Sequence, residues 1–281
     1  MDHHNGGVSR VLSKVLWAGL FLSVASSAMA AAIAPHRAIY DLELLHASSG
    51  AAIGSVSGRL AFEVSGSECD GWTVNFRIVN QFDYTEGNSR LIDTRSSSWE
   101  TGDGREMNYN QQEFVDNKPE GDKRLSVTRS DGNAAGEGVI TSPAEKKFSI
   151  AAETVFPMRH QLRLMQAAER GESRDTALVF DGSDEEKTVR AISTIGKKVD
   201  PGASKDDNAN PVAAPLKTLT SWPVTIGYYD PLEANAETPI YQISFDMYEN
   251  GVSTGLLMDY GKFALRGKLS NLELLKPETC K

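Results

Sequence analysis

The chain has 281 residues, 40% of them hydrophobic, and carries a formal net charge of −9 with a pI near 5.2. This hydrophobic content is enough for one substantial core. The acidity argues against a nucleic-acid partner, whose binding requires a basic face, and it gives no help in docking on an anionic membrane surface.

The first 30 residues have the pattern of an export signal. Arg10 and Lys14 give a positive start, residues 15–24 are apolar, and Ala28-Met29-Ala30 supplies a small-residue cleavage site. The apolar run is shorter than the roughly 20 residues that a spanning helix needs, which argues against the alternative of an uncleaved anchor. We therefore expect residues 1–30 to be a Sec-type signal peptide, cleaved near Ala30.

The mature chain, residues 31–281, is then expected in the periplasm. The removed segment carries Arg10 and Lys14 against Asp2, a net charge of +1, so the mature chain has a net charge of −10. No later stretch approaches transmembrane length, and we expect no transmembrane segment after removal of the signal.

Alternation of apolar side chains at two-residue spacing dominates the mature chain and predicts β-strands. The strands expected from this alternation and from the turn residues around it cover residues 40–44, 60–64, 72–78, 88–100, 105–116, 122–130, 175–181, 187–195, 222–228, 241–247, 256–258 and 263–275. Asn250-Gly251, between two apolar runs, is the strongest hairpin signal. Short strands joined by such turns are typical of an antiparallel meander.

One segment has the spacing of a helix instead. It runs from Pro157 to Arg170 and is followed by Gly171, a proline start and a glycine exit that suit helix ends. Met158 and Leu162 recur at helical spacing, opposite a face rich in arginine. We interpret this amphipathic helix as the plug of a curved sheet, in preference to a membrane-active helix.

Residues 196–217 are polar, rich in proline and alanine, and without periodicity. They predict a mobile surface loop. Such a loop can divide two domains, but we favour a single domain over residues 31–281, because the last strands are needed to close the sheet.

Two cysteines, Cys69 and Cys280, lie 211 positions apart, and both belong to the mature chain. In an exported protein this arrangement predicts a disulfide. The alternatives are two free thiols or a redox-active pair, and the absence of a C-x-x-C motif argues against the second.

The sequence contains no nucleophile elbow, phosphate-binding loop, dinucleotide fingerprint or H-E-x-x-H motif. His36, His46 and His160 stand far apart, so no metal site, cofactor or catalytic residue is assigned. The acidic run from Asp181 to Glu186 is compatible with a cation loop, but we prefer an acidic turn between two strands. Tyr228-Tyr229 can line a pocket or pack across strands, the commoner case, and the ligand-binding residues stay unknown.

The chain resembles the EipB family of envelope integrity proteins over nearly all of its mature length. The resemblance rests on the order of several short segments together with the paired cysteines. These segments are His36–Asp41, Cys69 with Trp72, Phe156-Pro157, Thr238–Tyr241, Tyr248–Val252, Asp259–Phe263 and the terminal Cys280.

The resemblance implies a mainly β fold, a strongly curved antiparallel sheet (a β-spiral or open half-barrel) wrapped around one α-helix. It also implies a Cys69–Cys280 disulfide and a periplasmic role in keeping the envelope of an alphaproteobacterium intact under stress. We expect a non-catalytic protein that binds a protein partner or an apolar ligand. The alternatives are a lipid or lipoprotein carrier and an envelope hydrolase.

Overall fold

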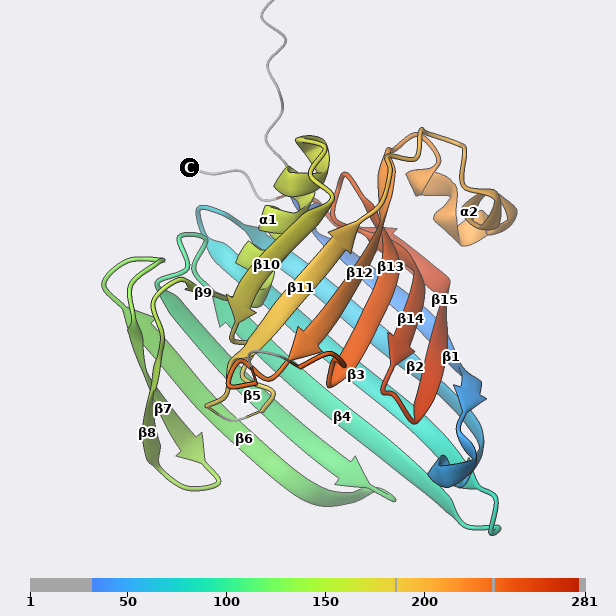
Figure 1. Ribbon diagram of the computed structural model, residues 1–281, viewed down its shortest axis with the longest axis horizontal. Coiled ribbons are helices and arrows are strands. Elements are labelled where there is room, and N and C mark those ends of the chain that lie inside the picture. Colours follow the sequence, from blue (N-terminus) through green and yellow to red (C-terminus); the bar gives the residue numbers. More distant parts are fainter. Residues whose placement is uncertain (1–31, 185, 234–235, 278–281) are drawn as a thin grey trace, which may run out of the picture.

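The computed structural model describes residues 32–184, 186–233 and 236–277. The expected signal peptide, residues 1–30, and Cys280 lie outside these residues. Figure 1 shows a strongly curved sheet with one long helix in its interior.

Most strands lie where the alternation and turns predicted them, but three strands between residues 136 and 155 were not predicted. Those of the first half are β1 (His36–Ala47), β2 (Ile53–Ser67), β3 (Gly71–Tyr84), β4 (Ser89–Glu100), β5 (Glu106–Val115), β6 (Lys118–Arg129), β7 (Gly136–Ser142), β8 (Lys146–Ile150) and β9 (Thr154–Val155). Those of the second half are β10 (Arg174–Val179), β11 (Val189–Ile195), β12 (Ser221–Tyr229), β13 (Tyr241–Tyr248), β14 (Ser253–Asp259) and β15 (Phe263–Leu274). A short 3-10 turn, η1 (Ser49–Ala51), precedes β2.

All fifteen strands belong to one sheet, in the order β8-β7-β6-β5-β4-β3-β2-β1-β15-β14-β13-β12-β11-β10-β9. The first and last strands pair in its middle, where His36 lies opposite Leu274. The two ends of the sheet, β8 and β9, are neighbours along the chain, so the sheet returns on itself and forms a nearly closed, barrel-like wall. Among the described pairs, the parallel one is β9 with β10, and α1 makes the crossover that a parallel pair requires.

Helix α1 (Pro157–Glu169) fills the interior. It starts with proline at its first turn, and the N–H groups of Gly171 and Glu172 donate to Ala168 and Ala167, the pattern of a Schellman cap. In Figure 1 it lies between the front strands β10–β12 and the fainter strands behind them. Its buried side chains share one core with Trp72 of β3 and Trp222 of β12. The predicted helix inside a curved sheet is therefore confirmed.

Residues 196–217 differ from the loop that the sequence predicted. They contain α2 (Lys205–Ala209) and the 3-10 helix η2 (Pro211–Leu216), capped by the side chains of Ser204 and Asn210. Ala213 and Leu216 are buried. The expectation of a segment without regular structure was wrong there, because both helices are too short to show a periodicity. No described helix is long and apolar enough to cross a membrane.

Candidate functional site

The cross-strand register decides which side chains of β3 and β4 face the interior. Trp72, which packs near α1, shares its face of β3 with Phe82 and Tyr84, because residues at even spacing point to one side. On β4, Arg90 lies directly opposite Phe82, and Ile92 follows on the same face. The inner face therefore continues past the helix, towards the turn between β3 and β4.

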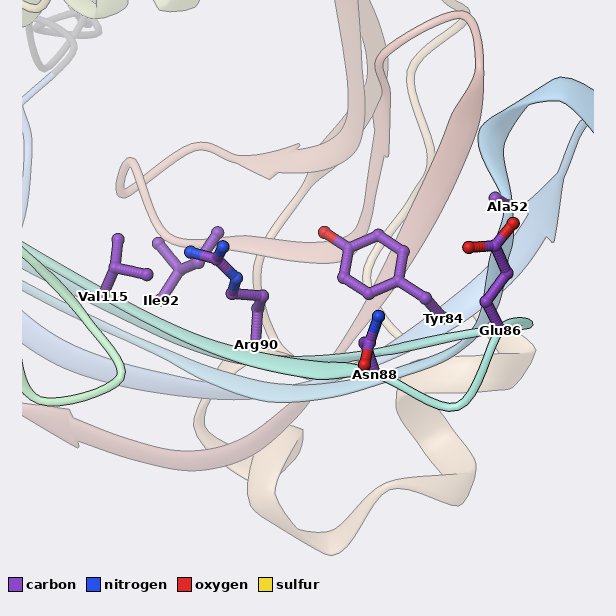
Figure 2. Close-up of a pocket in the computed structure, with 7 residues that line it drawn as sticks. All are labelled: Ala52, Tyr84, Glu86, Asn88, Arg90, Ile92 and Val115. Atoms are coloured by element: carbon purple, nitrogen blue, oxygen red, sulfur yellow. The ribbon is translucent and has the colours of Figure 1, made fainter.

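A pocket of about 460 Å³ lies on this part of the inner face. In Figure 1 the strands β3–β6 extend beyond the lower ends of β12–β15. Figure 2 shows the side chains rising from the sheet towards the C-terminal strands. The lining residues are Ala52, Tyr84, Glu86, Asn88, Arg90, Ile92 and Val115.

Five aromatic rings form a row beside this pocket. The ring centroids of Tyr228 and Tyr241 are 4.4 Å apart, those of Tyr241 and Tyr260 6.4 Å, and those of Tyr260 and Phe263 5.0 Å. Phe263 then meets Phe82, the inner-face neighbour of Arg90, edge to face at 5.9 Å. We call these five residues the aromatic row; it crosses from β12 to β3.

The row lies in surroundings of low polarity. Burial raises the pKa of Tyr228 and of Tyr241 above their usual range, and the charge of Asp181 adds to both shifts. Tyr228 lies directly opposite Tyr241 across β12 and β13, and Arg190 of β11 lies over the Tyr229 ring, so the sequence prediction that Tyr228 and Tyr229 pack across strands holds. Neither Tyr228 nor Tyr229 lines this pocket; the row meets it through Phe82, which lies opposite the pocket residue Arg90.

The connection from β12 to β13 exposes apolar side chains. Leu232, in the connection from β12 to β13, is 91% exposed, and Ile240 beside β13 is 58% exposed. The N–H of Ile240 donates to the carbonyl of Tyr228, which places it next to the aromatic row. We call Leu232 and Ile240 the apolar rim.

The described residues on either side of residue 185, in the acidic connection from β10 to β11, contact strands β6 and β8. The Nζ of Lys123 on β6 donates to the carbonyl of Ser183 at 2.5 Å, and Lys146 of β8 pairs with Glu186. Gly182 packs so closely on the Tyr109 ring that an added Cβ would lie 2.8 Å from its Cγ. No group of three or more metal-ligating residues occurs among the described residues, and Asp181 Oδ1 accepts from the N–H of Ser183. The described residues of this segment thus lie in the connection between β10 and β11, as the sequence predicted.

Polar groups gather between α1 and β10–β11, and the sequence did not predict them. His160 of α1, Asp175 and Ser193 are buried; the last two are directly opposed across β10 and β11. Burial lowers the pKa of His160 to about 4, so its ring is neutral at pH 7. Arg163 Nε donates to Asp175 Oδ1 at 2.7 Å, which ties α1 to the wall. A serine, a histidine and an aspartate can together form a nucleophilic site. Here, however, Ser193 is 0% exposed, so solvent does not reach its hydroxyl in this structure.

A second buried group holds the start of α1. Glu100, at the end of β4, accepts a hydrogen bond from the backbone N–H of Met158 at 2.5 Å. Burial raises the pKa of this carboxyl to about 8. Arg129 donates to the carbonyl of Thr154 and lies over the Phe156 ring. Glu100 is an even number of positions from Ile92 on β4, so alternation alone could have placed it on the inner face. No sequence signal indicated its contact with the helix.

The remaining sequence candidates lie apart. His36 is buried at the start of β1, where its Nδ1 lies 2.7 Å from the Ala34 carbonyl, and His46 is near the end of that strand. Cys69 lies in the turn between β2 and β3. Because Cys280 is outside the described residues, the Cys69–Cys280 disulfide stays a prediction.

Together these features define a barrel-like single-sheet protein whose interior is filled by one helix and whose open end carries a pocket. Residues 27–276 match the family described as EipB-like, and the chain belongs to that family. It is 35% identical over 260 residues to the cell envelope integrity protein EipB of Brucella abortus (strain 2308), covering 92% of this chain and 90% of that protein. Its fold is also similar to the crystal structure of a β-barrel-like protein from Brucella abortus, with a TM-score of 0.80 and 32% identity. That match covers 88% of this chain and 100% of the other.

Proposed function

We propose that the protein is a non-catalytic periplasmic protein that supports the integrity of the cell envelope under stress. The name of the Brucella relative supports the envelope role. The signal pattern of residues 1–30 supports the periplasmic location. In this proposal the protein acts by binding an apolar ligand or a protein partner at its open end.

The observation that carries the proposal is the aromatic row, which has the exposed Ile240 next to Tyr228 at one end and Phe82, opposite the pocket residue Arg90, at the other. Side chains as exposed as Leu232 and Ile240 contribute little to the core, and apolar groups gathered at a rim are a mark of binding sites. The pocket volume of about 460 Å³ is within the range of small-molecule sites. The same observation favours a lipid or lipoprotein carrier as the second candidate.

The test is complementation of a host strain that lacks the gene. The variant Leu232→Ser/Ile240→Ser changes only the apolar rim, and Leu274→Ser is the matched control, a leucine 45% exposed at the end of β15 beside His36. We expect the rim variant to leave cells sensitive to detergent and to cell-wall antibiotics, and the control to restore growth. Both variants must reach the wild-type amount in periplasmic extracts. Full rescue by the rim variant at that amount would contradict the proposal.

A further inference from the structure

We propose that the open end binds a single-chain amphiphile with an anionic headgroup, with the chain along the aromatic row and the headgroup at Arg90. This inference rests on the proposed function, because it names the ligand class of the same site. The occupant is a monomer, such as a fatty acid or an alkyl phosphate, and not a membrane surface.

The geometry of the aromatic row favours an alkyl chain over a sugar or a base. Tyr228 and Tyr241 are stacked with an angle of 18° between their rings, and Tyr260 and Phe263 with 26°. Stacked rings cover one another's faces, whereas sugars and bases are recognised by free aromatic faces. What a stacked row offers is a strip of ring edges. Ile92 and Val115 extend this apolar strip into the pocket.

Arg90 supplies the charge complement at the end of the strip. Its side chain is 58% exposed, and its ion pair with Asp116 has an N···O distance of 3.9 Å, too long for a hydrogen bond. A guanidinium in this state has donors for a ligand, and its planar fork matches a carboxylate or a phosphate. In a chain with a net charge of −9, an anion needs such a local cation.

Two carboxylates set the direction in which the ligand lies. Asp181 interacts electrostatically with Tyr228 and Tyr241, at the far end of the row, and would repel an anionic headgroup there. Glu86 also lines the pocket, but in Figure 2 the Tyr84 ring stands between it and Arg90. The headgroup is therefore placed at Arg90 and the chain end towards Tyr241.

The test compares four probes of equal chain length below their micelle concentrations: dodecanoate, dodecyl phosphate, dodecanol and dodecyltrimethylammonium. Binding to the purified mature chain is measured by native mass spectrometry and calorimetry. We expect both anions to bind, dodecanol to bind more weakly, and the cation to bind least. Arg90→Ala should lower the affinity for dodecanoate about tenfold and leave that for dodecanol unchanged, because a charge-assisted hydrogen bond is lost. The matched control is Arg124→Ala, a comparably exposed arginine of β6 that pairs with Asp122.

A second variant keeps the inference testable if Arg90→Ala is unstable. Arg90→Glu should reverse the preference, so that dodecyltrimethylammonium binds better than dodecanoate; thermal unfolding of each variant checks its fold. Equal effects of Arg90→Ala and Arg124→Ala would overturn the headgroup assignment, while the proposed function would stand if dodecanol still bound. No binding of any probe, or binding only to anionic vesicles in sedimentation, would overturn the inference as a whole. Failure of the proposed function itself would appear separately, in the complementation assay.

Discussion

Glu100 shows how one buried carboxyl links the helix to the sheet. Its Oε1 receives the N–H of Met158, one of the donors that a helix leaves unpaired at its start, so β4 caps α1 from another element. In water a glutamate is ionised at pH 7, but burial disfavours the charged form and raises the pKa of Glu100 to about 8. The neutral acid is therefore the form that stabilises the folded state.

This pKa shift predicts a pH dependence of stability. Because the folded pKa lies above the unfolded value of 4.5, the folded state binds more protons between the two values. The stabilisation of the folded state by protonated Glu100 is complete below pH 4.5 and is lost as the pH rises through about 8. Glu100→Gln keeps an acceptor for Met158 but has no charge to lose. Relative to wild type, its unfolding free energy should rise between pH 6.5 and pH 8, by at most about 1.4 kcal/mol per pH unit.

The measurement is urea unfolding of both proteins across this interval. The pH interval starts at 6.5 because, below this pH, the titration of His160 changes the unfolding free energy in the opposite direction to that of Glu100. Burial lowers the pKa of His160 to about 4, so its contribution is lost as the pH falls below 6.5. A constant difference between Glu100→Gln and wild type from pH 6.5 to pH 8 would show that Glu100 is ionised in the fold.

At the scale of single residues, the sequence could predict faces but not partners. Alternation along β3 places Phe82 and Tyr84 on one face of the strand, and this could be predicted from the sequence. The contact of Phe82 with Phe263 joins residues 181 positions apart, and no local pattern reports it. The pocket was missed for the same reason, because its lining comes from two loops and three strands whose mutual placement depends on the whole sheet.

At the scale of elements, a buried carboxylate ties the segment of α2 and η2 to the sheet. Asp207 is buried, and its Oδ2 accepts hydrogen bonds from Tyr248 Oη at 2.5 Å and from Thr254 Oγ1 at 3.0 Å. The N-cap Ser204 donates to the same oxygen. Asp207 thus fixes the segment against β13 and β14 with one carboxylate oxygen.

Asp207→Ala should destabilise the fold, because two buried hydroxyl groups lose their acceptor. We expect a loss of about 1–3 kcal/mol in unfolding free energy, and faster amide exchange throughout α2 and η2. Asp206→Ala is the control, since Asp206 is exposed in the same short helix. Urea unfolding and hydrogen exchange measure both effects. If the two variants had the same stability, the hydrogen bonds of Asp207 would not hold the segment.

The sequence predicted the helix and strands in which apolar side chains recur at a regular spacing over several residues. It did not predict the elements in which this spacing is short or interrupted. Pro157–Arg170 was expected as a helix and Pro157–Glu169 is observed, because its apolar face extends over several turns. β7, β8 and β9 were missed. At Gly138 an added Cβ would lie 2.1 Å from the Phe148 ring, so the wall is filled there by a neighbour's side chain and the alternation of β7 is interrupted.

The topology of the whole molecule places the two ends of the chain together. Leu274 lies opposite His36, and His36 lies opposite Val64, so β15, β1 and β2 are consecutive strands. Both β15 and β2 are antiparallel to β1, and they therefore run in the same direction. The curved antiparallel sheet was predictable from alternation and the family resemblance. Its order was not, because the central pair joins strands more than 200 residues apart.

This topology bears on the predicted disulfide. In the sequence Cys69 follows Val64 by five positions and Cys280 follows Leu274 by six, and Val64 and Leu274 both lie opposite His36. Two strand spacings separate β2 from β15, about 10 Å, while six residues of extended chain reach about 20 Å. The Cys69–Cys280 bond is thus within reach without any change in the sheet, and it would join the two strands on either side of the one that begins the fold.

The prediction is that Cys69→Ser destabilises the mature protein and loosens β15 first. Closing a loop of 211 positions limits the unfolded chain and stabilises by at most ~5 kcal/mol, so we expect a loss of a few kcal/mol. Thermal unfolding of wild type with and without reductant, beside Cys69→Ser and Cys280→Ser, measures it. The reduced wild type and both variants should melt at the same lower temperature, since each lacks the same bond. Hydrogen exchange should rise first in β15, which the bond would fix at its end, and not in β4 or β5. Identical melting of oxidised and reduced wild type would mean that the two cysteines are not joined.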